Sequence, residues 1–139
     1  MPITVTAPRG VLTPDGEREI LPRLTRELAR VSGLADNATF TSMIGGTVHV
    51  LAPERIYGGG ANRPLVMVEL KLPNIGLGSL EERAAFIAAA TDVVEQLTVG
   101  GHRREDTWVN VVNAPDGGWG IAGRAYSGQD LINALTAPV

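Results

Sequence analysis

The sequence contains no cysteine among its 139 residues. A chain without cysteine has no disulfide framework, no thiolate nucleophile and no cysteine–zinc site. Histidine is nearly absent too, since His49 and His102 are the only two. Two histidines are too few for a histidine-based metal site unless carboxylates join them. We therefore expect a protein that works without a metal or another cofactor, and the missing cysteine fits a reducing compartment.

Long apolar stretches are missing as well. No run reaches the roughly 20 residues of a membrane span, and residues 1–6 lack the basic start and apolar stretch of a signal peptide. A net charge of −3 gives no indication of nucleic acid or an anionic membrane as a partner. Hydrophobic residues make up 44% and charged residues 19%, which is typical of a globular protein. We expect a single cytoplasmic domain over residues 1–139.

The most informative feature is an internal repeat that divides the chain into two similar halves. Pro2 opens a strand-like run in which apolar and polar residues alternate, and Pro64 opens another strand-like run over 65–70. An Ala-Pro-acid triplet at 52–54 returns at 114–116, with the same spacing as the two prolines. Two separate landmarks with the same period indicate a true repeat. The predicted division is a pseudo-repeat over 2–60, a second over 64–124 and a C-terminal tail over 125–139.

Each copy has the pattern of a strand, a helix and a second strand. In the first copy, Thr13 is placed to cap a helix that Gly33 ends. In the second copy, Ser79 has the spacing of a capping box. The closing strands are predicted over 47–51 and 108–112. The expected apolar stripe of the second helix is Leu80, Ala84, Ile87, Val94 and Leu97.

A strand, a crossover helix and a returning strand form a parallel βαβ unit. Two such units in one chain predict an α+β fold, with a four-stranded sheet and both helices on one face. Apolar residues occupy both sides of the second copy's first strand, Val66 and Val68 on one and Leu65 and Met67 on the other. Because the helices cover only one face, we expect an oligomer to cover the second.

Several motifs, in order along the chain, resemble the tautomerase superfamily. The Met-Pro start, the βαβ repeat and the glycine-rich end of each copy are similar to that group, and 115–123 resembles the hairpin that ends 4-oxalocrotonate tautomerase. The chain as a whole is more similar to macrophage migration inhibitory factor. The stretches that carry this likeness are Pro8-Arg9 with Pro14-Asp15-Gly16, Tyr57-Gly58-Gly59, Asn74-Ile75-Gly76 and Trp108-Val109-Asn110.

The resemblance implies a homotrimer with active sites between subunits, and Pro2 as the catalytic residue once Met1 is removed. The chain departs from the family at the cations that usually bind a substrate carboxylate, and Ala38 stands where the decarboxylases have an acidic residue. These departures speak against decarboxylase and dehalogenase activity. The positions that match the missing cations are Val11 or Leu12, Leu34, Asn74, Gly76 and Trp108.

An N-terminal Pro2 is a secondary amine, whereas the internal Pro64 has no ionisable nitrogen. Burial against apolar walls lowers the pKa of such an amine. A base with a pKa near 7 takes a proton from the carbon beside a ketone, and the resulting enolate needs donors aimed at its oxygen. The candidate substrate-binding residues are Ile75, Trp108, Trp119 and Tyr57 as apolar walls, Asn110 as a donor, and Arg9, Lys71 or Arg124 as the carboxylate anchor.

These side chains also have structural interpretations, because tryptophans are common in cores and interfaces, and arginines are common on surfaces. Our leading hypothesis is keto–enol tautomerisation of a small carbonyl acid, a 2-oxo acid that carries an aryl group as one option. One alternative is a trimeric binding scaffold of the same superfamily with weak catalysis. Another is a hydratase or dehalogenase that acts on an unsaturated acid.

Overall fold

The centre of the fold is a mixed β-sheet of four strands. They are β1 (Pro2–Pro8), β2 (Gly45–Leu51), β5 (Val66–Leu72) and β6 (Thr107–Asn113), in the order β2-β1-β5-β6. A computed structural model describes residues 1–138. β1 is parallel to β2 and β5 is parallel to β6, while β1 and β5 are antiparallel at the centre of the sheet. Each parallel pair therefore belongs to one half of the chain.

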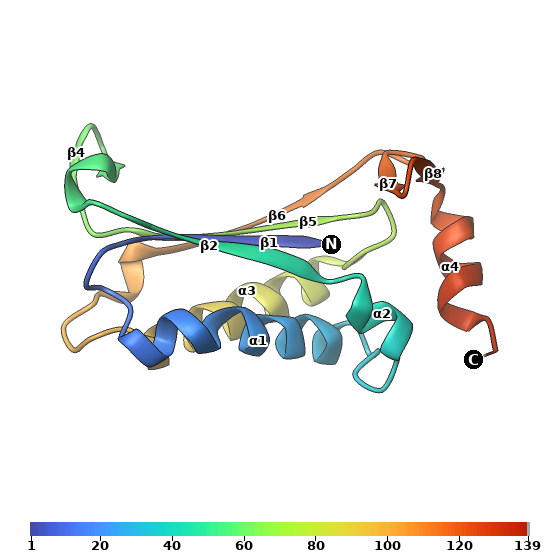
Figure 1. Ribbon diagram of the computed structural model, residues 1–139, viewed down its shortest axis with the longest axis horizontal. Coiled ribbons are helices and arrows are strands. Elements are labelled where there is room, and N and C mark those ends of the chain that lie inside the picture. The colour runs from blue at the N-terminus through green and yellow to red at the C-terminus, as the bar shows by residue number, and fades with distance from the viewer. Residues whose placement is uncertain (139) are drawn as a thin grey trace.

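Two helices, α1 (Pro14–Val31) and α3 (Leu80–Leu97), lie side by side on one face of the sheet (Figure 1). Thr13 caps α1 by accepting a hydrogen bond from the backbone N–H of Gly16 at 2.9 Å. Ser79 caps α3 in the same way through the N–H of Glu82 at 3.1 Å. Gly33, with a φ of +71°, follows the end of α1 in the left-handed conformation that favours glycine. The predicted α+β fold with two βαβ units is confirmed.

The buried face of α3 differs from the predicted stripe. Leu80 is 71% exposed and Ile87 is 37% exposed, and Ala84 is exposed as well, so three of the five residues expected in the stripe lie outside the core. Phe86 and Ala90 begin it instead, because Leu80 is the first residue of the helix and lies beyond the edge of the core. The buried residues of α3 are Phe86, Ala90, Thr91, Val93, Val94 and Leu97.

Smaller elements rise from the two ends of the sheet, on the side away from α1 and α3 (Figure 1). At one end, β3 (Tyr57–Gly58) and β4 (Ala61–Asn62) form a hairpin between the two βαβ units. At the other end, β7 (Trp119–Ile121) pairs with β8 (Arg124–Tyr126). The remaining elements are α2 (Ala38–Ser42), α4 (Gly128–Thr136) and the short 3-10 turns Pro53–Arg55 and Arg104–Asp106.

The second strands of the two units keep the repeat spacing seen in the sequence, whereas the first strands are spaced slightly further apart. Gly45 and Thr107 begin β2 and β6, with the same spacing as the repeated motifs of the sequence. Pro2 and Val66 begin β1 and β5 at a slightly longer spacing, so Pro64 precedes its strand instead of opening it. The two units therefore share a topology while their connecting segments differ in length.

The core lies between the sheet and the two long helices. Ile3, Val5 and Ala7 of β1 are buried there, and so are alternate residues of β5. The other face of β5 exposes Glu69 and Lys71, and Leu65, which was expected on that face, is fully buried. The β3–β4 hairpin accounts for the burial of Leu65, since a Cβ at Gly58 would lie 3.0 Å from the Cδ1 of Leu65. No helix within residues 1–138 has the length and apolar character needed to cross a membrane.

The corrected face of α3 gives a stability prediction. Phe86→Ala should lower the free energy of unfolding by about 3–5 kcal/mol, because it leaves a cavity in the core. The neighbouring Ile87→Ala should cost less than about 1 kcal/mol, because Ile87 is largely outside the core. Urea denaturation of both variants measures the difference, and equal losses would show that the helix face has been assigned wrongly.

Candidate active site

Pro2 begins β1, one of the two central strands, at the end of the sheet where the β7–β8 hairpin lies (Figure 1). Pro2 is exposed, whereas Met1 before it is only 6% exposed. The carbonyl of Met1 accepts a hydrogen bond from the N–H of Gly45 at 3.2 Å. The terminal amine of Met1 donates to the carbonyl oxygen of Met43. Backbone groups at the start of β2 and in the turn before it thus hold the chain terminus in place.

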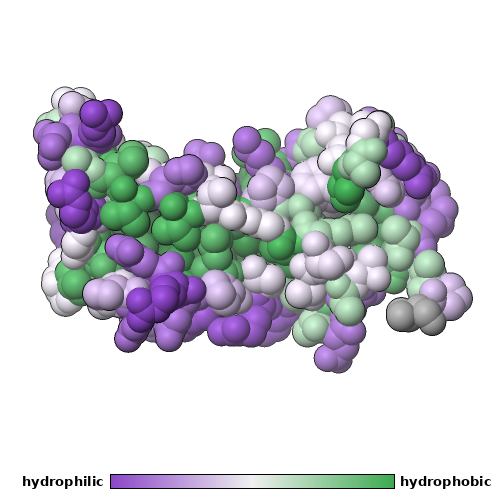
Figure 2. Space-filling view, viewed as in Figure 1, coloured by the Kyte–Doolittle hydropathy of each residue, from purple (hydrophilic) through white to green (hydrophobic). Residues whose placement is uncertain are grey.

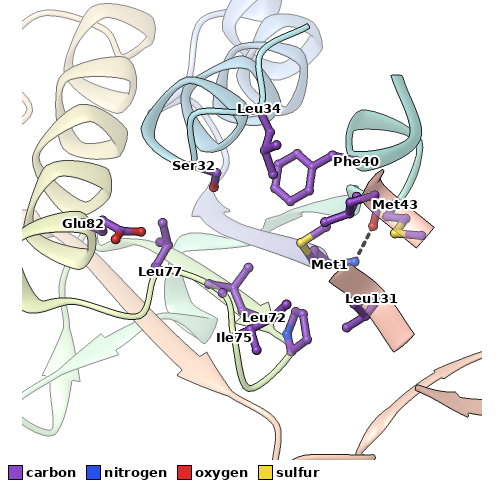
Figure 3. Close-up of a pocket in the computed structure, with 13 residues that line it drawn as sticks. Met1, Ser32, Leu34, Phe40, Met43, Leu72, Ile75, Leu77, Glu82 and Leu131 are labelled. Carbon is purple, nitrogen blue, oxygen red and sulfur yellow. Dashed lines mark hydrogen bonds between the residues drawn. The ribbon is translucent and has the colours of Figure 1, made fainter. Parts of the chain in front are cut away.

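The side chain of Met1 lies in an apolar cavity between α2, α4 and the end of β5 (Figure 3). About 110 Å³ of this cavity is free while Met1 is present. This volume is well below the roughly 300–1,000 Å³ of a typical small-molecule site. Ser32 and Glu82 contribute its polar side chains. The apolar part of the lining is Met1, Leu34, Phe40, Met43, Leu72, Pro73, Ile75, Leu77, Leu131 and Leu135, with the backbone of Gly76.

A second, more open hollow lies beside the first and includes Pro2. Its lining contains Pro2 and Thr47, together with Trp119 and Ile121 of β7. Met1 and Met43 line both hollows. Because Met1 is bonded to the nitrogen of Pro2, that nitrogen lies where the two hollows meet.

Trp119 has an unusual hydrogen-bonding state. Its indole N–H is buried and has no partner among residues 1–138, where no other buried side-chain nitrogen or oxygen lacks one. A buried donor without an acceptor costs roughly 1–3 kcal/mol. Trp119 lines the hollow, but its indole nitrogen is itself buried, so a bound molecule would accept from it only after the side chain turned.

Burial also affects the charge at the chain terminus. It lowers the pKa of the Met1 amine from the ordinary value of 8.0 to about 6, because the charged form loses its contact with water. The Met1 amine is therefore largely neutral at pH 7.

Of the three candidate cations, Lys71 lies nearest to Pro2 along the sheet. Ile3 pairs with Leu70, and one further step of the same antiparallel register sets Lys71 beside Pro2 on the open face. Within residues 1–138, no carboxylate forms an ion pair with Lys71. Lys71 is also the only lysine in the chain.

The two candidate arginines are placed differently. Arg124 lies in β8, with its guanidinium 3.4 Å from a carboxylate oxygen of Asp130 and 4.5 Å from the ring centroid of Tyr126. Arg9 follows the last residue of β1, at the opposite end of that strand from Pro2. Of the three candidates, Lys71 is therefore the one that combines a place near Pro2 with no ion pair in the described chain.

The other predicted site residues are divided between the two ends of the sheet. Ile75 lines the apolar cavity. Asn110 lies on β6 beside Glu69, two strands away from β1. Trp108 donates its indole N–H to the carbonyl of Glu105 at 3.1 Å, and Tyr57 lies in the hairpin at the far end.

A single chain thus places four of the predicted site residues at one end of the sheet: Pro2, Ile75, Trp119 and Lys71. Four others lie elsewhere on the sheet or beyond its far end: Asn110, Trp108, Tyr57 and Arg9. Sequence reasoning missed Phe40, Leu131 and Leu135 as cavity residues. They come from short helices far apart in sequence, and only the apolar spacing of 131 and 135 in the tail gave any signal. In the part of the chain that the structure describes, no cluster of three or more acidic or histidine side chains is arranged to hold a metal ion.

Comparisons with known proteins reveal a likeness in structure. The chain matches no protein-family model, and no curated protein matches it. Its structure is similar to Pt0534 inactivated by 2-oxo-3-pentynoate, at 20% identity and a TM-score of 0.73, over 94% of this chain and 98% of that one. A fused 4-OT in the form of a symmetric trimer is 17% identical, with a TM-score of 0.75 and the same coverage.

Macrophage migration inhibitory factor of Toxoplasma gondii is similar too, at 14% identity and a TM-score of 0.69. The likeness covers 91% of this chain and all of the other. These structures span nearly the whole chain with the same arrangement of sheet and helices. The chain has the fold of the tautomerase superfamily, as the resemblance in sequence implied.

The lowered pKa at the terminus gives a prediction for the chain that keeps Met1. Between about pH 6 and 8 the unfolded state binds a proton that the folded state does not, so the free energy of unfolding should rise with pH across that window, by about 1 kcal/mol once screening by the solvent that reaches the amine is allowed for. Urea denaturation at several pH values measures the slope.

The control for this measurement is the same chain acetylated on its terminal nitrogen. Burial also lowers the pKa of His102, against the opposing charge of Asp106, and contributes a slope of the same sign. Acetylation removes only the contribution of the amine. If the two chains showed equal slopes, the amine would not be desolvated in the folded state.

Proposed function

We propose that this protein is a cofactor-independent tautomerase that interconverts the keto and enol forms of a small 2-oxo acid, with Pro2 as general base after removal of Met1. The observation that carries the proposal is the position of the Pro2 nitrogen, at the junction of an apolar cavity and an open hollow. The fold shared with fused 4-OT and with Pt0534 supports it.

The proposed reaction is a proton transfer through one base. The neutral amine of Pro2 takes a proton from C3 of the 2-oxo acid, and the electron pair of that C–H bond moves into the enolate. Return of the proton to the enolate oxygen gives the enol, and its return to C3 gives the keto form. Trp119 lines the hollow that includes Pro2, and its ring supplies part of the wall beside the reacting carbon.

Charge near the site favours an anionic substrate. The Lys71 ammonium is the cation we assign to the substrate carboxylate, because it lies beside Pro2 in the register and forms no ion pair within residues 1–138. Its positive charge also disfavours protonation of a Pro2 amine, and so lowers the pKa of that amine further.

We also propose that the working form is a homotrimer. β2 and β6 are both edge strands of the sheet, and such edges favour pairing with another chain. Figure 2 shows hydrophobic residues gathered along the β2 edge, where Val50 and Leu51 are exposed. Fused 4-OT relatives form symmetric and asymmetric trimers.

A trimer offers a role to the predicted site residues that lie away from Pro2. Asn110 and Trp108 are exposed on the open face or edge of β6, and Tyr57 is exposed on the projecting hairpin. In a trimer with sites between subunits, these side chains and Arg9 would complete the site of a neighbouring subunit.

The first test is Pro2→Ala, with intact mass measured on the same samples. Wild-type protein that has lost Met1 should catalyse phenylenolpyruvate ketonisation, and the variant should lose about 100-fold or more of kcat/KM, in the range of general-base catalysis. Because a general base must be neutral to accept a proton, kcat/KM should rise with pH through the pKa of the Pro2 amine. Size-exclusion chromatography with light scattering checks that both proteins keep the same assembly.

A chemical label gives an independent readout of the same amine. A neutral amine adds to the alkyne of 2-oxo-3-pentynoate, forming an N–C bond while its proton moves to carbon. Processed protein should gain one adduct on its N-terminal peptide, and the fraction that keeps Met1 should gain none on Pro2. Processed, trimeric protein with neither activity nor adduct would contradict the proposal and favour a binding scaffold.

The assignment of the carboxylate to Lys71 has its own test. Lys71→Gln should raise KM for a 2-oxo acid by about tenfold, the order expected for a lost charged hydrogen bond. The methyl ester of the same acid should be unaffected, because it has no carboxylate. Arg124→Gln is the matched control, since Arg124 is already paired with Asp130. A larger effect from Arg124→Gln would move the assignment to that residue.

A further inference from the structure

Thr47 carries the first side chain of β2 beside the open hollow. In the parallel pairing of β1 with β2, Pro2 lies opposite Gly45 and Thr4 lies opposite Thr47. Ile3 is buried against the helices, and side chains alternate between the two faces along a strand. Pro2 and its partner Gly45 therefore belong to the open face, and so does Thr47. Thr47 lines the same hollow as Pro2.

The space between Pro2 and Thr47 is open, because the residue opposite Pro2 is a glycine. A Cβ at Gly45 would meet no atom within 4 Å. Diagonal neighbours on adjacent strands have Cα atoms roughly 7–8 Å apart. That distance is spanned by a carbonyl group together with a reacting separation of roughly 3–3.5 Å and a hydrogen bond of roughly 2.7–2.8 Å. A 2-oxo acid with C3 at the Pro2 nitrogen can therefore place its oxygen at Thr47.

The hydroxyl of Thr47 is held by a second side chain on the same face. Its Oγ1 lies 2.9 Å from Nε2 of His49, two residues further along β2. A hydroxyl has one hydrogen to donate and two lone pairs with which to accept. When the Nε2–H of His49 donates to Oγ1, the hydroxyl hydrogen is free to donate to a bound molecule. Hydrogen bonds in a chain polarise one another, so this arrangement also strengthens the donor.

We infer that the Thr47 hydroxyl donates a hydrogen bond to the enolate oxygen, and that His49 is a positioning residue that holds this hydroxyl in the donating orientation. The inference rests on the proposed function and names the donor that the enolate needs. An enolate oxygen carries more negative charge than the ketone oxygen from which it forms, so the bond strengthens as the proton leaves C3 for Pro2. The electron pair of the C–H bond stays on the enolate, and Thr47 keeps its proton.

The experiment follows deuterium uptake at C3 of phenylpyruvate in D2O by proton NMR, with processed protein. Thr47→Val keeps the shape of the side chain and should lower kcat by at least about tenfold, the order expected for a lost hydrogen bond to a charged group. KM should change much less, because the bond is strongest in the transition state. Thr47→Ser keeps the hydroxyl and should restore most of kcat.

Thr6→Val is the matched control, since Thr6 belongs to β1 and lies outside the lining of the hollow. It should change neither kcat nor KM. If Thr47→Val does not fold, as judged by circular dichroism, Thr47→Ala is the second variant without a hydroxyl. Folded protein that lacks the hydroxyl and keeps the wild-type kcat would overturn the role of Thr47.

The role of His49 has its own variants and a spectroscopic test. His49→Leu should lower kcat by about three- to tenfold, and His49→Gln should restore part of it, because the amide of glutamine can donate to Oγ1. Long-range nitrogen–proton NMR shows which ring nitrogen of His49 carries the hydrogen, and we expect Nε2. A neutral ring with its hydrogen on Nδ1 would reverse the hydrogen bond and overturn the role of His49.

Calorimetric binding of oxalate, a planar mimic of the enolate of a 2-oxo acid, separates this inference from the proposed function. Binding that Thr47→Val weakens and Thr47→Ser restores, without deuterium exchange by the wild type, would support the donor and overturn the tautomerase. Exchange that needs Pro2 and is unchanged in Thr47→Val would do the reverse. Protein with neither exchange nor binding that depends on Thr47 would overturn both.

Discussion

The antiparallel pairing of β1 with β5 is the contact on which the rest of the structure depends. Each βαβ unit alone would leave the edge of its first strand unpaired, and the pairing of Ile3 with Leu70 through Thr6 with Met67 joins the two units into one sheet. It gives α1 and α3 a common face, and the core forms between them and the sheet. The same pairing sets Lys71 beside Pro2, so one backbone register determines both the packing and the charge near the chain terminus.

The chain terminus is buried in a way that ordinary termini are not. A free amine is normally solvated, because its charge is costly to remove from water. Here Met1 is held by Gly45 and Met43, and burial brings the pKa of its amine to about 6. A protein gains stability by keeping a charged terminus in solvent. Burial of the Met1 amine therefore does not add to the stability of the fold. That terminus belongs to the chain that keeps Met1, and removal of Met1 opens the space that its side chain occupies beside Pro2.

Much of the fold could be predicted because its signals are local. Thr13 and Ser79 cap the helices where the sequence indicated, and the alternating runs became β1, β2, β5 and β6. The errors occurred where a local signal has two interpretations. Leu80, Ala84 and Ile87 have helical spacing with Val94 but lie outside the core. Periodicity predicts how far apart the buried residues of a helix or strand lie along the chain. Tertiary packing decides which of the residues with that spacing are buried.

The sequence by itself determined that the chain contains two βαβ units, that Pro2 begins a strand, and that the family's usual cations are absent. These follow from residue order, repeat period and cap chemistry, which depend mostly on neighbours close in the chain. Only the tertiary structure decided that Lys71 lies near Pro2 with no ion pair in the described chain, and that α4 closes a cavity around Met1. It also decided that Trp119 carries a buried donor without a partner among residues 1–138. Such relations join residues from distant parts of the sequence, and no local pattern records them, because packing brings them together only after the sheet has formed.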